Sequence, residues 1–208
     1  MGPYRPGVAS WCASQELRRA RMTRIIAGDH GGRRLQTLSG AQTRPTSDRV
    51  REAFFSALDT MTDLSGARFA DLYAGSGAVG LEALSRGAEH VLLVESDSKA
   101  ARVVRDNVVA LKVGPAARLV TGKVLQVLAD RPDGGPYDVV FADPPYAVGN
   151  DEMDTVQRAL LAGGWLAPDA VVVFERSTRT EPLSWVDGLT GDRTRRYGET
   201  TLWYGRRS

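Results

Sequence analysis

Apolar positions between residues 68 and 174 follow two alternating patterns. Short runs rich in Val, Leu and Phe are separated by segments in which apolar residues recur every three or four positions. The runs predict buried strands, and the periodic segments predict helices that cover them. We expect strands at 68–73, 90–94, 118–121, 137–142 and 170–174, and helices at 78–86, 98–111, 124–128 and 151–161. This alternation is typical of an α/β fold with a mostly parallel sheet.

Both ends of the chain depart from the alternation. Residues 24–27 predict a short strand, and a helix begins near Asp48, after an extended segment that Pro45 ends. One face of this helix is apolar: Val50, Phe54, Ala57, Leu58 and Met61. Near the C-terminus, residues 190–197 and 200–206 are strand-like runs around Gly198. They predict a hairpin that makes one edge of the sheet antiparallel.

Length and composition are those of a globular protein with one well-buried core. The 208 residues are 42% hydrophobic and 25% charged. No apolar stretch approaches the ~20 residues that span a bilayer, and the first 21 residues lack the apolar core of a secretory signal. We therefore expect a cytoplasmic protein with a disordered extension (1–21), a basic N-terminal arm and helix (22–62) and one large core (63–208).

Positive charge gathers in the N-terminal quarter. Residues 1–52 hold 10 Lys/Arg against 4 Asp/Glu, whereas the remainder holds 17 against 21. A basic arm on a mildly acidic body predicts a polyanionic partner, although a solvated N-terminus explains the same charges equally well. Gly31-Gly32-Arg33-Arg34 is a positive turn able to follow a phosphate backbone, and it is also an ordinary hairpin signal.

The turn Asp143-Pro144-Pro145-Tyr146 follows the apolar run 137–142. Two prolines end the predicted strand and stiffen the turn at its carboxyl end, where open α/β sheets bind ligands. A carboxylate and a free backbone carbonyl offer two acceptors to an exocyclic amine, and the tyrosine ring can stack on the base that carries it. The turn therefore predicts a site for a flat base with an amino group.

A glycine-rich loop at 75–80 fits the Gly-x-Gly-x-x-Gly pattern, with Glu95 twenty residues beyond Gly75. Close approach to the backbone and an acid for ribose hydroxyls predict a nucleoside ligand. Taken alone, the loop fits an NAD-dependent oxidoreductase as well as any other nucleoside-binding protein. Asp71, placed to receive a cationic ligand group, and the turn at Asp143 favour a different cofactor.

With these motifs the sequence resembles the class I S-adenosylmethionine-dependent methyltransferases. Residues 71–77 (DLYAGSG) look like their cofactor motif, Glu95 like their ribose acid and 143–146 (DPPY) like their amino-methylation motif. Within that class, residues 24–28 (RIIAG), 44–52 (RPTSDRVRE) and 80–88 (GLEALSRGA) resemble the RsmD family. That family methylates N2 of a guanine in 16S ribosomal RNA of the small subunit. The resemblance covers residues 22–207.

The resemblance implies a Rossmann-like fold: a seven-stranded, mostly parallel sheet with an antiparallel last strand and helices on both faces. It implies S-adenosyl-L-methionine as cofactor and 16S ribosomal RNA, in the small subunit or its assembly intermediate, as partner. The turn 31–34 departs from the family's Arg-Gly-Arg, and Gly122-Lys123 replaces its usual Gly-Asp, so we expect backbone near Gly122 to hold the adenine.

The resemblance also implies three sets of site residues. The catalytic set is Asp143, Pro144 and Tyr146. The cofactor set is Asp71, Tyr73, Gly75, Ser76, Gly77, Glu95, Ser96, Gly122, Lys123, Val124 and Asp143. The RNA set is Arg24, Arg33, Arg34, Arg44, Thr46, Arg49, Arg51, Pro145 and Tyr146.

The expected chemistry is methyl transfer to an amine held by Asp143 and the Pro144 carbonyl. It requires no metal, and His30 and His90 are too far apart in the sequence to suggest a metal site. Adenine or cytosine amino-methyltransferases share the turn, and only the N-terminal segments separate this chain from them. Glutamine methyltransferases of release factors use Asn in place of Asp143, and a non-catalytic RNA-binding protein would not need that residue.

Overall fold

The computed structural model describes residues 22–38, 48–145 and 148–208. Its helices are α1 (Asp48–Leu58), α2 (Ala78–Ser85), α3 (Ser98–Leu111), α4 (Val124–Leu128) and α5 (Asn150–Ala162). Its strands are β1 (Met22–Arg24), β2 (Arg34–Gln36), β3 (Arg68–Leu72), β4 (His90–Glu95), β5 (Ala117–Thr121), β6 (Tyr137–Ala142), β7 (Leu166–Ser177), β8 (Leu189–Tyr197) and β9 (Thr200–Arg207). Every element predicted between residues 68 and 174 is present. The predicted strand at 24–27 is wrong, because the ladder of β1 ends at Arg24.

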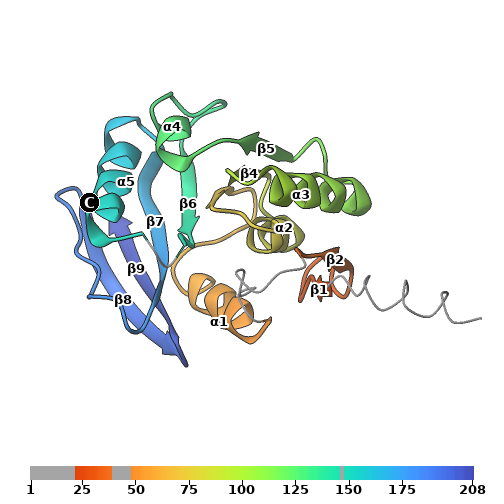
Figure 1. Ribbon diagram of the computed structural model, residues 1–208, viewed down its shortest axis with the longest axis horizontal. Coiled ribbons are helices and arrows are strands. Elements are labelled where there is room, and N and C mark those ends of the chain that lie inside the picture. The colour runs from red at the N-terminus through yellow and green to blue at the C-terminus, as the bar shows by residue number, and fades with distance from the viewer. Residues whose placement is uncertain (1–21, 39–47, 146–147) are drawn as a thin grey trace, which may run out of the picture.

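Seven strands form one sheet in the order β5-β4-β3-β6-β7-β9-β8 (Figure 1). The strands β3 to β7 run parallel, and β9 lies antiparallel between β7 and β8. The C-terminal hairpin is therefore confirmed, and so is the reversed last strand that the family resemblance implied. Since β3 and β6 are neighbours, the carboxyl ends of the strands that carry the two main motifs meet at one edge of the sheet.

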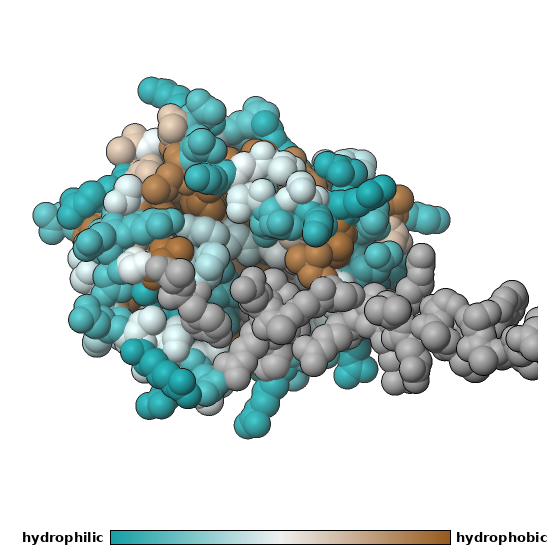
Figure 2. Space-filling model, in the orientation of Figure 1, coloured by the Kyte–Doolittle hydropathy of each residue, from teal (hydrophilic) through white to brown (hydrophobic). Residues whose placement is uncertain are grey.

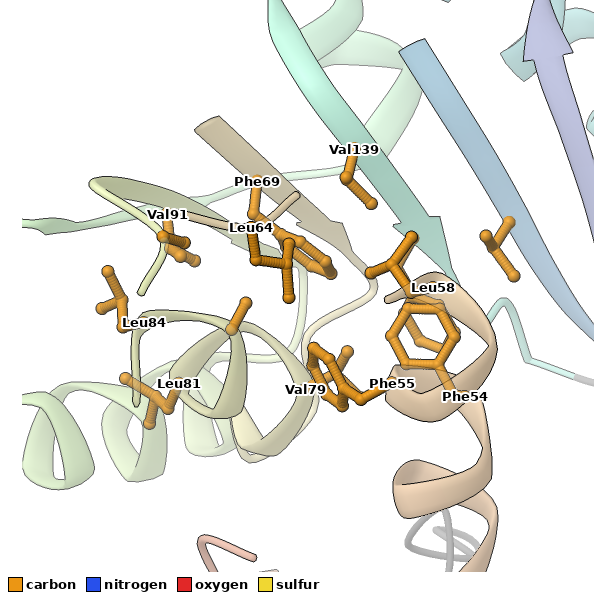
Figure 3. Packing of buried hydrophobic residues seen from close by; sticks show 14 of the residues in the cluster. Phe54, Phe55, Leu58, Leu64, Phe69, Val79, Leu81, Leu84, Val91 and Val139 are labelled. Carbon is orange, nitrogen blue, oxygen red and sulfur yellow. The ribbon is translucent and has the colours of Figure 1, made fainter. Parts of the chain in front are cut away.

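Helices cover both faces of this sheet. On one face α1, α2 and α3 bury a cluster that includes Phe54, Phe69 and Phe141. On the other face α4 and α5 bury a second cluster around Tyr137, Leu160 and Trp165. Figure 3 shows Phe54 and Phe55 of α1 pointing toward the strands and the side chains of α2. The helix α1 is thereby fixed beside the end of β6, where the Asp143 turn begins.

The N-terminal hairpin β1–β2 is bound to α2 and α3 by buried polar groups. The carboxylate of Glu82, which is fully buried, accepts hydrogen bonds from the backbone N–H groups of Ile26 (2.7 Å) and Ala27 (3.0 Å). Ser85 accepts from the N–H of His30 through its hydroxyl and from the N–H of Asp29 through its carbonyl. Because breaking these bonds would leave the buried Glu82 carboxylate without its partners, they hold the hairpin to the core.

Most of the described surface in Figure 2 is hydrophilic, with smaller apolar patches between the charged side chains. Among the described residues, no helix is long and apolar enough to cross a membrane.

Two glycines of the hairpin have a left-handed backbone, but only one of them packs closely against another segment. Comparing their substitutions separates the cost of backbone strain from the cost of a steric clash. Gly28 and Gly32 have φ values of 79° and 81°, but only at Gly28 would a Cβ meet another atom, 1.7 Å from the Ser85 carbonyl oxygen. We predict that Gly28→Ala lowers the free energy of unfolding by at least about 2 kcal/mol more than Gly32→Ala, which carries only the backbone strain of about 1 kcal/mol. Urea denaturation of both variants measures this, and equal losses would mean that the hairpin does not pack on α2 as described.

Candidate active site

Four strands deliver polar groups to one edge of the sheet. Asp71 lies near the end of β3, Glu95 ends β4, Asp143 directly follows β6, and Glu175 lies near the end of β7. Because parallel strands end at the same edge, residues that are far apart in the sequence become neighbours there. The predicted cofactor and amino-methylation motifs therefore belong to one site.

The glycine-rich loop after β3 leaves open space above its backbone. Gly75 has a φ of 57°, and a Cβ built there would meet nothing within 4 Å. Its N–H donates to Glu95 Oε2 (2.8 Å), and the other carboxylate oxygen accepts from the N–H of Asp97 (2.7 Å). Glu95 thus ties the loop to the end of β4, where a carboxylate is placed to meet ribose hydroxyls.

Asp71 lies in the interior below the loop. Its carboxylate is 1% exposed and accepts a hydrogen bond from the N–H of Gly80 in α2 (2.9 Å). Burial raises the pKa of Asp71 to about 7; the Gly80 hydrogen bond lowers it and the Glu95 charge raises it. A buried carboxylate is better ionised when a cation is near, which agrees with its predicted role beside a cationic ligand group.

The remaining residues of the predicted cofactor set lie around this loop. The Gly122 N–H donates to the Glu95 carbonyl (3.0 Å), which places the start of α4 beside the end of β4. Ser96 and Lys123 are exposed, whereas the side chain of Val124 is buried, so only its backbone can face a ligand. Tyr73 has a left-handed φ of 72°, and its buried hydroxyl has no hydrogen-bond partner among the described residues.

Asp143 extends the parallel ladder by one residue, since its N–H donates to the Leu72 carbonyl (3.4 Å). Burial raises its pKa well above the usual range, and the Glu175 and Asp71 charges raise it further. Pro144 is buried and Pro145 exposed. A small cavity beside the turn is lined by Asp143, Pro144, Pro145, Glu175, Arg176, Ser177, Thr180 and Thr200. Tyr146 lies outside the described residues.

Sequence reasoning missed the wall of this cavity that β7 provides. Glu175 and Arg176 are 9% and 6% exposed, and both line the cavity beside Asp143. A signal for them was present: Glu175 directly follows the apolar run 170–174, just as Glu95 and Asp143 follow theirs. An acid at the carboxyl end of a parallel strand is a candidate site residue wherever it occurs.

The basic residues of the N-terminal segment divide into exposed and buried groups. Arg24 and Arg34 are exposed and stand opposite each other in the β1–β2 register. Arg33 donates to the Ala110 carbonyl at the end of α3 (2.6 Å), and Arg49 is exposed on α1. Arg24 lies 3.7 Å from the Asp48 carboxylate, which already compensates part of its charge. Arg44 and Thr46 lie outside the described residues.

Arg51 does not belong with the predicted RNA contacts. Its side chain is 1% exposed, donates to the Arg24 carbonyl and to Asp48, and lies 3.7 Å from Glu82. Placed on the core side of α1, the guanidinium compensates the fully buried Glu82 charge, which Arg86 also contacts at 2.9 Å. A buried charge requires such partners, so Arg51 holds the arm to the core and is not available to RNA.

One buried amide joins the arm to the cofactor loop. The Asn107 side chain on α3 exchanges two hydrogen bonds with the backbone of Gln36 in β2, at 2.8 and 3.0 Å. The same side chain donates to the Ser76 carbonyl (2.9 Å). The arm and the glycine-rich loop are therefore fixed relative to each other.

Comparison with known proteins places the chain in a family. Residues 23–206 match the family described as conserved hypothetical protein 95. Ribosomal RNA small subunit methyltransferase D of Escherichia coli K12 is 39% identical over 166 residues, covering 78% of this chain and 80% of that protein. The Haemophilus influenzae protein of the same name is 35% identical over 77% of this chain and 81% of its own length.

A solved structure agrees with these sequence matches. The yhhF protein of Escherichia coli superposes with a TM-score of 0.79 at 34% identity, covering 90% of this chain and 98% of that one. The chain belongs to the conserved hypothetical protein 95 family, which is the RsmD family of S-adenosylmethionine-dependent ribosomal RNA methyltransferases.

Proposed function

We propose that this protein transfers a methyl group from S-adenosyl-L-methionine to the exocyclic N2 amine of a guanine in 16S ribosomal RNA. The observation that carries the proposal is the position of Asp143, which extends β6 next to the glycine-rich loop of β3. The names of the relatives support ribosomal RNA of the small subunit as the substrate class. Family membership overturns the alternative of an NAD-dependent oxidoreductase.

The residues at the loop fit the cofactor. The open space above Gly75 admits a ligand close to the backbone, and Glu95 is placed for ribose hydroxyls. The Gly122 backbone lies beside the end of β4, where the adenine would be held. The buried carboxylate of Asp71 and the partly buried carboxylate of Asp143 favour a cation in their neighbourhood. When bound, S-adenosylmethionine supplies a methyl group already activated on a sulfonium.

Asp143 and Pro144 act on the amine. An exocyclic amine is a weak nucleophile because its lone pair is delocalised into the base ring. The Asp143 carboxylate and the Pro144 carbonyl accept its two N–H bonds, which favours a pyramidal nitrogen and aims the lone pair at the methyl carbon. The bound cofactor would supply the methyl group and keep the S–C electron pair on its sulfur, and Asp143 or water would take the proton that the amine loses. Positioning of the two reactants supplies much of the rate.

RNA reaches this edge from the side of the basic arm. The target base must leave its stack to enter the site, and Tyr146 is the residue proposed to stack on it, for ~1–3 kcal/mol. The exposed Arg24, Arg34 and Arg49 are proposed to contact phosphates, together with Arg44. We further propose that the protein acts in the cytoplasm as a monomer, on the small subunit or its assembly intermediate.

Replacing Asp143 tests its role in the chemistry. We predict that Asp143→Ala lowers methyl transfer at least about 100-fold, because an acceptor aimed at the reacting amine is lost, while RNA affinity stays within about twofold. Single-turnover transfer of a labelled methyl group and a filter-binding titration measure the two quantities. Asp151→Ala, at an exposed carboxylate of α5, is the control and keeps both. Parallel loss of rate and RNA affinity in Asp143→Ala would contradict the assigned role.

Replacing Arg34 tests the RNA-binding face of the hairpin. We predict that Arg34→Ala weakens RNA binding and reduces the slope of log affinity against log salt by about 0.7–0.9, the loss of one phosphate contact. Arg158→Ala removes an exposed arginine from α5, on the opposite face of the sheet, and leaves the slope unchanged. An unchanged slope in Arg34→Ala would remove the hairpin from the RNA interface.

A further inference from the structure

The family motifs explain how the exocyclic amine of the substrate base is held. They do not explain how the rest of the base is recognised. Beside Asp143, the wall of the cavity is formed by β7 and includes the Glu175 carboxylate. This side chain is 9% exposed, and the Thr200 hydroxyl lies 3.5 Å from its Oε1. A carboxylate has about four acceptor positions, so it can receive a further donor from a ligand.

Strand register places Glu175 directly beside Asp143. Phe141 is paired with Val173, and Ala142 with Phe174, so the next pair along the two strands is Asp143 and Glu175. Side chains alternate between the faces of a strand. Phe141 and Val173 belong to the cluster under α1 and α2, so Asp143 and Glu175 return to that face. The Glu175 charge also raises the pKa of Asp143, as expected for neighbouring carboxylates.

The three bases with an exocyclic amine differ in the ring atom next to it. In adenine the neighbour of N6 is N1, and in cytosine the neighbour of N4 is N3; both are hydrogen-bond acceptors. In guanine the N2 amine has N3, an acceptor, on one side and N1–H, a donor, on the other, so only guanine offers a donor next to its amine. With the amine held at Asp143, a second acceptor beside it attracts guanine and repels the other two bases. This difference separates the guanine substrate from the adenine and cytosine alternatives that share the Asp143 turn.

We propose that Glu175 is a specificity-determining residue, whose carboxylate accepts the N1–H of the guanine while Asp143 and the Pro144 carbonyl hold its N2 amine. This inference rests on the proposed function and names the group that selects its base. Adenine or cytosine would present an acceptor to the Glu175 carboxylate, and the buried lone pairs would then have no donor. The site therefore rejects these bases strongly.

Arg176 follows Glu175 on β7 and also lines the cavity. Neighbouring residues of a strand point to opposite faces, and the Arg176 Nη2 donates to the Asn150 side chain at the start of α5 (3.4 Å). Arg176 is therefore assigned no contact with the base.

The test compares two RNA substrates that carry the same amine. In one, the target nucleotide is guanine; in the other it is 2-aminopurine, which keeps the N2 amine but has an acceptor at N1. We predict that the wild-type protein methylates the 2-aminopurine RNA about 100-fold more slowly in kcat/KM. In Glu175→Gln, whose amide can donate to N1, we predict that this ratio falls to within about 10-fold, chiefly through a lower rate on guanine and a higher rate on 2-aminopurine.

Glu199→Gln is the matched control, because Glu199 is a carboxylate that pairs with Arg179 at the exposed end of the β8–β9 hairpin. It should keep the wild-type ratio. If Glu175→Gln slows both substrates by the same factor, Glu175 only supports the fold of the site and the inference is wrong. If wild-type protein methylates the guanine RNA at another atom, or not at all, the proposed function fails first, and the two failures are thereby distinguished.

Discussion

Three carboxylates lie on one face of the sheet at the ends of three neighbouring parallel strands. Asp71 of β3, Asp143 after β6 and Glu175 of β7 repel one another, and burial disfavours the charge of Asp71 and Asp143. Such an arrangement costs stability in the empty protein. A cation near Asp71 and hydrogen-bond donors at Asp143 and Glu175 would reduce this cost. The cationic cofactor and the proposed guanine, which carries N–H groups at N1 and N2, would supply these groups.

The other buried charges hold separate segments of the molecule together. Glu82 of α2 receives two backbone N–H groups from the hairpin and contacts Arg51 and Arg86, so one carboxylate joins three segments. Asn107 then joins the hairpin to the carbonyl of Ser76 in the cofactor loop. The basic segment is thus held at a fixed distance from the cofactor loop. RNA bound by the hairpin, as proposed above, would meet a cofactor loop whose orientation is already set.

Local patterns in the sequence were sufficient for the strands and helices between residues 68 and 174, for the C-terminal hairpin and for the two main motifs. The apolar runs predicted the strands because a parallel sheet buried on both faces leaves no polar positions in its interior. Local patterns could not show whether a charged side chain lies in the interior or at the surface. Arg51 was predicted to meet RNA, because its partner Glu82 lies on another helix and nothing in the sequence pairs the two. Glu175 was missed for a related reason: its position beside Asp143 depends on the register between β6 and β7, which local patterns do not give.

Mapping the transferred methyl group tests the proposed reaction most directly. Small subunits and free 16S ribosomal RNA that lack the modification are incubated with the protein and labelled S-adenosyl-L-methionine, and the modified nucleotide is identified by digestion and mass spectrometry. We predict label on N2 of a guanine in at least one of the two substrates. Label on an adenine or cytosine amine would keep the chemistry of Asp143 and contradict the assigned base, and label on protein would contradict the RNA substrate itself.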